Sequence, residues 1–339
     1  MNDEDWRSNA RHEMLLERAL LLKNIRAFFD VRGVVEVETP LLSHHSTTDP
    51  HLDSLSTSFR DETCYLNTSP EYAMKRLLAG WQQPIYQICK AFRDDELGPN
   101  HNPEFSMLEW YRPGYSMEQL MDELAELVKT VCQGSQSSLL NSASHKNPVF
   151  ERLSYQQAFE RFAGLNPHKT SSAQCYQIAK ANAVEIPQGL SVDDEVDDWL
   201  DWLLTQLVLP AFEKGGFTFL YDYPKSQCAL AKIGLNDTAV GPPVLVAKRF
   251  ELFFGEIELA NGFHELSDAK EQLQRFEAEN QSREQAGKEL GCIDNNFIAA
   301  LSSGLPDCSG VAMGLDRLLM VLADAKYIDQ VLAFSWSRA

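Results

Sequence analysis

An arginine, a carboxylate and two aromatic side chains fall within one short stretch, residues 91–111 (AFRDDELGPNHNPEFSMLEWY). The pattern predicts two strands joined by a polar loop. Because successive side chains in a strand alternate between its faces, Phe105, Glu109 and Tyr111 should share one face. A glutamate is unsuited to a plain core, and the planar fork of Arg93 can bind a carboxylate or a phosphate. The stretch therefore predicts a hairpin that holds a charged ligand.

Hydrophobic spacing and turn signals predict the elements that must position these residues. Strand patterns cover residues 34–40, 85–93, 217–223 and 244–259. Helical patterns cover residues 11–31, 69–80, 116–131, 155–162, 173–183, 193–209 and 270–289, and residues 310–323 are predicted as a turn feeding a buried helix. Ser69 is expected as an N-cap, Pro70 as the first residue of its helix and Gly80 as its stop.

Strands outnumber clean βαβ alternations, which favours an α+β fold with an antiparallel sheet flanked by helices. We expect one domain over residues 1–339 and a flexible, serine-rich loop at residues 134–147 (GSQSSLLNSASHKN). The seven cysteines are scattered and odd in number, which indicates neither a disulfide framework nor a structural zinc site.

The charge balance bears on the partners of the chain. Thirty basic and 49 acidic side chains give a net charge of −19, and affinity for phosphate backbones comes largely from lysine and arginine. A tRNA partner is therefore the less favoured expectation. No apolar run approaches the ~20 residues of a membrane helix, and the first residues lack the apolar core of a secretory signal. We expect a cytoplasmic protein with no membrane partner.

Three motifs now resemble those of class II aminoacyl-tRNA synthetases, in the same order. They are RGVVEVETP (32–40), FRDDE (92–96) with HNPEF (101–105), and GVAMGLDR (310–317). The resemblance implies a large antiparallel sheet flanked by helices, usually in a homodimer formed through the first motif. Within the class the chain is most similar to the lysyl branch, through SPE (69–71), HNPEFSMLEWY (101–111) and FELFFGEIELANGFHEL (250–266).

The resemblance implies a reaction that joins a carboxylate to the α-phosphate of ATP and expels pyrophosphate. Such chemistry needs positioning and positive charge more than a base. The implied roles place Arg93 between the substrate carboxylate and the α-phosphate, and Arg317 at the γ-phosphate. The ATP contacts implied are Arg93, Asp94, Asp95, Asn102, Phe105 (stacked on adenine), Glu258, Leu259, Gly314 and Arg317, and the Mg²⁺ ligands implied are Glu251 and Glu258. The alternative, ordinary ion pairs and a core aromatic, stays open for each residue taken alone.

The charge of the implied amino-acid pocket indicates its ligand. Glu71, Glu109 and Glu265, with Tyr111, occupy the positions where the lysyl branch binds the two amines of its substrate. An acidic set of this kind points to a lysine-like diamino acid, although Glu71 could equally be a carboxylate at a helix N-terminus. The substrate-binding residues implied are Ser69, Pro70, Glu71, Glu109, Tyr111, Asn261, Glu265 and Ala312. His101 and His264 are expected to be structural.

One departure from the lysyl branch concerns the start of the chain. Lysyl-tRNA synthetases carry an anticodon-binding domain ahead of the first motif, and roughly thirty residues precede it here, too few for a domain. The chain then resembles more closely the elongation factor P–lysine ligases, which activate (R)-β-lysine and attach it to a lysine side chain of elongation factor P. ELANGFHEL (258–266) and PDCSGVAMGLDR (306–317) carry this resemblance. The alternatives are a truncated lysyl-tRNA synthetase charging tRNA or another small acceptor, and a non-catalytic regulatory subunit.

Two further departures lie inside the motifs. Ala312 stands where lysyl synthetases usually have glycine, and its methyl group is expected to reshape the pocket near the amine-bearing carbons and disfavour α-lysine. Asp95 stands where the second motif usually has a glutamate, and Glu96 follows it.

Overall fold

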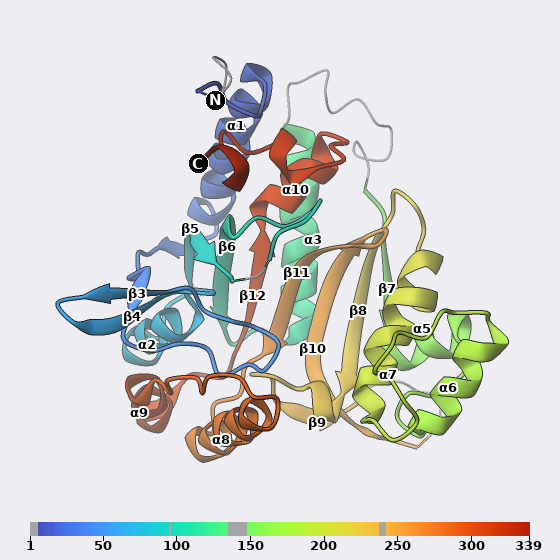
Figure 1. Cartoon of the computed structure of the whole chain (residues 1–339). Coiled ribbons are helices and arrows are strands. Elements are labelled where there is room, and N and C mark those ends of the chain that lie inside the picture. Colours follow the sequence, from blue (N-terminus) through green and yellow to red (C-terminus); the bar gives the residue numbers. More distant parts are fainter. Residues whose placement is uncertain (1–5, 95, 135–147, 237–241) are drawn as a thin grey trace. The chain divides into compact units, whose positions relative to one another are not determined.

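The computed structural model describes residues 6–94, 96–134, 148–236 and 242–339. Asp95 and nearly all of the expected loop at 134–147 lie outside the described residues. The chain divides into two compact units, Met1–Asn147 with Glu265–Ala339, and Pro148–His264; each is described by itself (Figure 1). None of the helices within the described ranges combines the length and the apolar character needed to cross a membrane.

The first unit contains a sheet with the strand order β1–β5–β6–β12, in which β1 runs parallel to β5 and the other neighbours are antiparallel. Its strands are β1 (Val35–Glu36), β5 (Ile85–Phe92), β6 (Glu104–Pro113) and β12 (Cys308–Gly314). The helices are α1 (His12–Asp30), α2 (Glu71–Trp81), α3 (Met117–Gly134), α8 (Ala269–Gln285), α9 (Asn295–Gly304) and α10 (Leu315–Leu322). A small antiparallel sheet is formed by β2 (Leu42–Ser43), β4 (Glu62–Leu66) and β3 (Ser56–Phe59), and short 3-10 turns cover Ile328–Gln330 and Trp336–Arg338.

The two faces of β6 serve different purposes. On one face Trp110 lies fully buried, packs 5.4 Å from the ring of Phe29 in α1 and donates a hydrogen bond of 3.1 Å to Glu123 in α3. Phe29 also stacks on Tyr86 of β5, with ring centroids 4.4 Å apart. Helices α1 and α3 therefore cover this face, and the alternate side chains, including Glu109, point to the other.

The second unit is also a sheet with helices. Its strand order is β11–β10–β8–β7, with β9 paired to β10; β7 runs parallel to β8 and the other pairs are antiparallel. The strands are β7 (Phe150–Ser154), β8 (Phe217–Pro224), β9 (Ile233–Leu235), β10 (Leu245–Phe254) and β11 (Ile257–His264). The helices are α5 (Tyr155–Phe162), α6 (Ser172–Ala181) and α7 (Val196–Leu203), continued by π and 3-10 turns at Leu204–Val208 and Leu209–Ala211, with a further 3-10 turn at Lys225–Gln227.

The core of this unit lies where its helices pack on the sheet, around Trp199, Phe159 and Tyr155. Local signals fix the helix starts, because Ser154 and Ser171 form capping boxes with the glutamines three residues later.

Most of the predicted elements are confirmed, including the α+β fold, the hairpin of β5 and β6, and the helix at 155–162. Several predictions were wrong in detail. Gly80 lies inside α2, which ends at Trp81 and is capped by Gln82 in the left-handed conformation (φ 55°). Pro70 precedes the helix, and Ser69 accepts only a long 3.4 Å bond from Glu71 N–H. The strand expected at 34–40 is limited to Val35–Glu36.

The expected turn at the start of 310–323 is instead the end of strand β12, because Gly310 pairs in register with Tyr111 of β6. The strand pattern at 244–259 resolves into β10 and the first residues of β11, joined at Gly255 (φ 53°), and β11 continues to His264. Helix α9 and the short strands β2, β3, β4, β7 and β9 carried too few residues or too weak an alternation to be predicted.

Candidate active site

Strands β5, β6 and β12 bring separate motifs side by side on the open face of the first unit. Glu109 of β6 is directly opposite Gln87 of β5 and Ala312 of β12. Directly opposite residues of antiparallel strands share a face, so these three side chains form one row. Two further rows lie on the same face. Phe105 is opposite Ala91 toward one end of the strands, and Tyr111 is opposite Gly310 toward the other end.

Two of the predicted glutamates share a buried lysine. Lys75 of α2 is fully buried, and its Nζ lies 2.6 Å from Glu71 Oε1 and 2.6 Å from Glu265 Oε2. Burial alone would lower the pKa of Lys75, but the carboxylates of Glu265 and Glu71 outweigh it and raise that pKa above its ordinary value. The structure thus brings Glu71 and Glu265 together around a cation that belongs to the chain itself.

Glu109 is the third carboxylate of this set. It is 2% exposed, and the Tyr111 hydroxyl donates a hydrogen bond of 2.6 Å to its Oε1. Burial, followed by repulsion from Glu71, raises the pKa of Glu109 well above its usual range. Its second oxygen, Oε2, is buried and has no hydrogen-bond partner among the described residues. A bound cation would satisfy that oxygen and stabilise the ionised form.

Position 310 requires a glycine, because β12 passes directly against the side chains of Glu265 and Tyr111 there. A Cβ atom at Gly310 would lie 2.4 Å from Glu265 Oε1 and 2.4 Å from Cδ1 of the Tyr111 ring. These separations are far inside van der Waals contact, so the missing side chain is what allows Glu265 and Tyr111 to lie against the strand.

Arg93 and Phe105 lie together at the opposite end of the face. The Arg93 guanidinium carbon is 5.1 Å from the centroid of the Phe105 ring, and its Nη1 donates to Glu96 Oε1 at 3.2 Å. The Arg93 Nε atom is buried without a hydrogen-bond partner among the described residues. A free donor above an aromatic ring suits an anion attached to a planar group.

Arg317 is in the first turn of α10, directly after Gly314, as predicted. Its Nη2 lies 2.6 Å from His101 Nε2 and its Nε donates to the Asn100 carbonyl at 3.3 Å. His101 therefore orients Arg317, a role that its position in a loop had not revealed. Asn102, predicted as a nucleotide contact, uses both ends of its amide on the backbone, donating to the Glu104 carbonyl at 2.6 Å and accepting from Trp336 N–H at 2.9 Å.

The second unit carries the predicted Mg²⁺ ligands and Asn261. Glu251 is directly opposite Asn261 in the β10–β11 pair, and Arg249 pairs with Glu251 and donates to Asn261 Oδ1 at 3.2 Å. The Tyr223 hydroxyl donates to Glu251 Oε2 at 2.6 Å. Burial, opposed by Arg249 and assisted by the charge of Glu258, raises the pKa of Glu251 to about 7.

Comparison with known proteins identifies the family. A family model described as tRNA synthetases class II (D, K and N) matches residues 4–338. The chain belongs to this family. The resemblance of the three motifs to class II synthetases is thereby confirmed, together with the fold that it implied.

Relatives within the synthetase family align with nearly the whole chain. A protein of Haemophilus ducreyi named elongation factor P–(R)-β-lysine ligase is 42% identical over 341 residues, which cover 99% of this chain and 97% of that protein. Proteins of the same name from Klebsiella pneumoniae subsp. pneumoniae and from Salmonella paratyphi B are each 43% identical over 342 residues, 98% of this chain and 98% of theirs.

Several residues that support the synthetase motifs were missed in the sequence. No role was predicted for Lys75, nor for Asp316 within the third motif. Asp316 is 1% exposed, accepts 2.6 Å from Ser106 N–H and pairs with Arg18, so it fixes the start of α10 against β6. Tertiary contacts over such sequence distances leave no local signal, although a charged residue inside a buried helix start could have drawn attention to Asp316.

A second set of contacts holds the segment 49–53, between β2 and β3, which touches the second motif. Arg283 of α8 is buried and donates to the carbonyls of Asp49 and Leu52 at 2.8 and 3.1 Å, and to Asp53 Oδ1 at 2.7 Å. The Asp53 carbonyl in turn accepts 3.0 Å from Asp94 N–H, next to Arg93.

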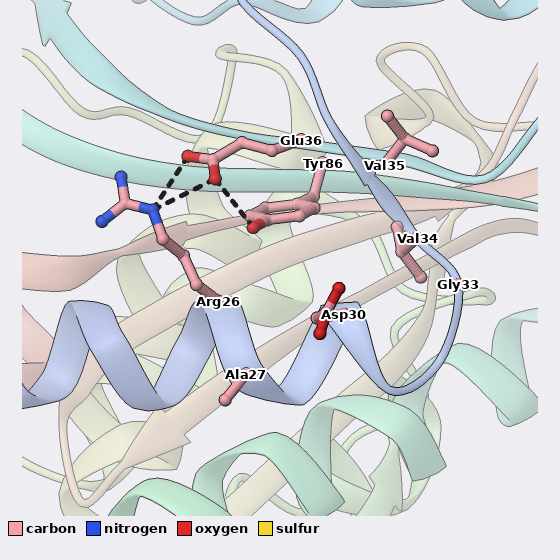
Figure 2. Close-up of a pocket in the computed structure, with 8 residues that line it drawn as sticks. All are labelled: Arg26, Ala27, Asp30, Gly33, Val34, Val35, Glu36 and Tyr86. Atoms are coloured by element: carbon pink, nitrogen blue, oxygen red, sulfur yellow. Dashed lines mark hydrogen bonds and ion pairs between the residues drawn. The ribbon is translucent and has the colours of Figure 1, made fainter.

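The first synthetase motif borders a different cavity. This cleft, of about 520 Å³, lies beside the end of α1 and strand β1. Its lining residues are drawn in Figure 2. Among them, Glu36 accepts hydrogen bonds from Arg26 Nε at 3.1 Å and from the Tyr86 hydroxyl at 3.0 Å. The cleft contains none of the predicted ligand-binding residues. Of the remaining predicted residues, Ser69 and Pro70 lie just before α2, and Leu259 is buried in β11.

Proposed function

We propose that this chain is an ATP-dependent ligase that activates (R)-β-lysine and transfers it to the ε-amino group of a lysine on translation elongation factor P. The observation that carries the proposal is the near-complete coverage, at 42–43% identity, of synthetase-family proteins that bear this name. The acidic amine pocket on β6 supports it independently, because it fits a diamino acid.

The first step forms the adenylate. The carboxylate of the amino acid attacks the α-phosphorus of ATP, a mixed anhydride forms and pyrophosphate leaves. Arg93 would bind the carboxylate and the α-phosphate, using the Nε donor that is buried without a partner among the described residues. Phe105, below that guanidinium, would hold the adenine, and Arg317, oriented by His101, would bind the γ-phosphate. Fixed positive charge of this kind stabilises the charge that develops in the transition state.

The amino acid would be selected by charge. Three buried or partly buried carboxylates, Glu71, Glu109 and Glu265, face one lysine ammonium, that of Lys75. The set keeps an excess of negative charge, which attracts the two ammonium groups of a diamino acid and disfavours neutral or acidic side chains. Ala312, opposite Glu109, narrows the pocket at the same row.

Mg²⁺ is the metal that the proposed reaction needs. Glu251 and Glu258 would hold it, because Mg²⁺ prefers one or two carboxylates completed by phosphate oxygens. The donor set fits, since the two carboxylates repel each other enough to help raise the pKa of Glu251, and a divalent cation would relieve that repulsion. Among the described residues no larger group of metal-ligating side chains competes for the ion. The bound ion would supply charge neutralisation on the phosphates.

The second step forms an amide bond. The neutral ε-amine of the acceptor lysine attacks the carbonyl carbon of the adenylate, AMP leaves, and the amine proton passes to a nearby carboxylate or phosphate oxygen. The net charge of −19 suits a protein acceptor better than tRNA, whose phosphates it would repel.

A labelling experiment tests the proposal. The chain is incubated with ATP, Mg²⁺ and labelled (R)-β-lysine, (S)-β-lysine or α-lysine, together with elongation factor P or with tRNA. We expect label from (R)-β-lysine on elongation factor P and none on tRNA. An Arg93→Gln variant serves as the control for contaminating ligases. Label on tRNA alone would instead support a truncated lysyl-tRNA synthetase, and the lack of pyrophosphate exchange with every diamino acid would support a non-catalytic subunit.

The proposal includes the setting in which the ligase works. We propose a cytoplasmic homodimer that acts as a single catalytic domain over residues 1–339. The homodimer is supported by exposed apolar side chains at the first motif, where Val31 is 77% and Val35 is 41% exposed. Light scattering at micromolar concentration tests it, and a monomeric mass would refute it.

A further inference from the structure

Two buried oxygen atoms on the pocket face accept no hydrogen bond from the described residues. Gln87 and Glu109 are each 2% exposed. Gln87 Oε1 and Glu109 Oε2 both lack a hydrogen-bond partner within the described part of the chain. A buried acceptor left without a donor is destabilising and rare in folded proteins. A pair of them therefore points to a ligand.

The pairing of the strands places these two acceptors next to each other. Gln87 of β5 is in register with Glu109 of β6, and directly opposite residues have Cβ atoms about 4.5–5.5 Å apart and share a face. Gln87 also lies beside the Cys89 thiol. Both side chains reach only a few ångströms from their strands, so one small group can contact both oxygens at once.

The chemistry of two neighbouring acceptors, one of them charged, selects a cation with several donors. An ammonium group carries three N–H donors and a positive charge. The other glutamates of the set are differently placed, because Lys75 already lies 2.6 Å from both Glu71 and Glu265. Glu109 is thus the carboxylate of the three to which this lysine makes no ion pair.

We propose that Gln87 is a substrate-binding residue, and that Gln87 and Glu109 together form the subsite for the ammonium group of the diamino acid that lies farther from its carboxylate. The position of the row supports this choice of amine. Glu109 is four residues along β6 from Phe105, which corresponds to ~13 Å in a strand, so the row lies well away from the end of the face that carries Arg93. This inference rests on the proposed function and assigns a new residue to its pocket.

The test replaces Gln87 with methionine, which keeps the length of the side chain and removes the acceptor. Pyrophosphate exchange would give the KM for (R)-β-lysine and for ATP, and thermal unfolding without ligands would give the stability. We expect the KM for the diamino acid to rise about 10- to 100-fold, since a hydrogen bond to a charged group is lost, with the KM for ATP unchanged. The melting temperature should stay the same or rise, because an unpaired buried amide is removed.

Two further variants sharpen the result. Gln87→Glu keeps an acceptor at the same place and should retain tight binding of the diamino acid. Gln272→Met is the matched control: Gln272 is also a buried glutamine whose amide has no partner among the described residues, and it lies on α8 rather than on this face. It should leave the KM for the diamino acid unchanged.

A substrate analogue distinguishes the two amines. 3-Aminohexanoic acid keeps the amine near the carboxylate and lacks the distal one. The unmodified chain should strongly prefer (R)-β-lysine to this analogue, and Gln87→Met should reduce that preference by the same factor as the rise in KM. An unchanged preference, or a fall in melting temperature with equal rises in both KM values, would overturn the proposal. If the unmodified chain activates no diamino acid, the proposed function itself fails, and that result is visible before any variant is made.

Discussion

Replacing Lys75 with methionine tests whether the pocket depends on its internal cation. Lys75 is fully buried between Glu71 and Glu265, and both ion pairs measure 2.6 Å. Methionine keeps most of the apolar stem, so packing changes little. The charge, however, is lost, and two carboxylates are left without their partner.

The expected cost follows from that geometry. Removing one partner of a buried ion pair typically costs about 3–5 kcal/mol because the other charge stays desolvated. We therefore expect the free energy of unfolding of Lys75→Met to fall by about 3–5 kcal/mol at pH 8.

Urea unfolding at pH 8 measures this loss, with the midpoint and the slope fitted separately. Lys90→Met is the matched control, since Lys90 pairs with Glu104 at 3.2 Å while their side chains are 40% and 52% exposed. Such an exposed pair contributes at most about 1 kcal/mol. If Lys75→Met lost no more stability than Lys90→Met, the role given to Lys75 would be wrong.

Three other substitutions have expected outcomes. Burial raises the pKa of Glu279 to about 7, so the stability that its proton provides is complete below the unfolded pKa near 4.5 and is lost as the pH rises through 7. Glutamine stays neutral at every pH. Between pH 5 and pH 8 the free energy of unfolding of Glu279→Gln should therefore rise by about 2 kcal/mol relative to that of the unmodified chain. Parallel pH curves from chemical denaturation would contradict this. Gly310→Ala forces a Cβ atom against Glu265 and Tyr111 and should lower stability by about 1–3 kcal/mol and raise the KM for the diamino acid; an unchanged melting temperature and KM would show that the strand can move. Ala312→Gly should increase activation of α-lysine in pyrophosphate exchange, and the lack of any gain would remove Ala312 from the account of specificity.

The sequence predicted those features that depend on local pattern. Alternation along β6 correctly separated Glu109 from Trp110, because a strand with one covered face obeys a period of two whatever its neighbours are. The prediction of Gly80 as a helix stop failed because glycine only permits the left-handed conformation, and Gln82 adopts it instead. Lys75 could not be recognised, since its partner Glu265 lies far along the chain.

The motif order located the site residues on their elements, but their contacts depended on strand register. Gln87 became notable only when it was found opposite Glu109. Asp95 lies outside the described residues, so its contact with ATP remains a prediction. The roles of Arg93, Arg317 and the Glu251–Glu258 pair are likewise predictions.

The hydrogen bonds from Arg283 to residues 49–53 affect when the chain can fold during its synthesis on the ribosome. Asp94, beside Arg93, is hydrogen-bonded to Asp53, and the segment around Asp53 is anchored by a helix that follows the whole second unit in the sequence. A nascent chain that has emerged only as far as Arg93 therefore lacks this anchor. The nucleotide end of the site can take its final form only after α8 has been synthesised, so an incomplete chain would carry the second motif without being able to use it.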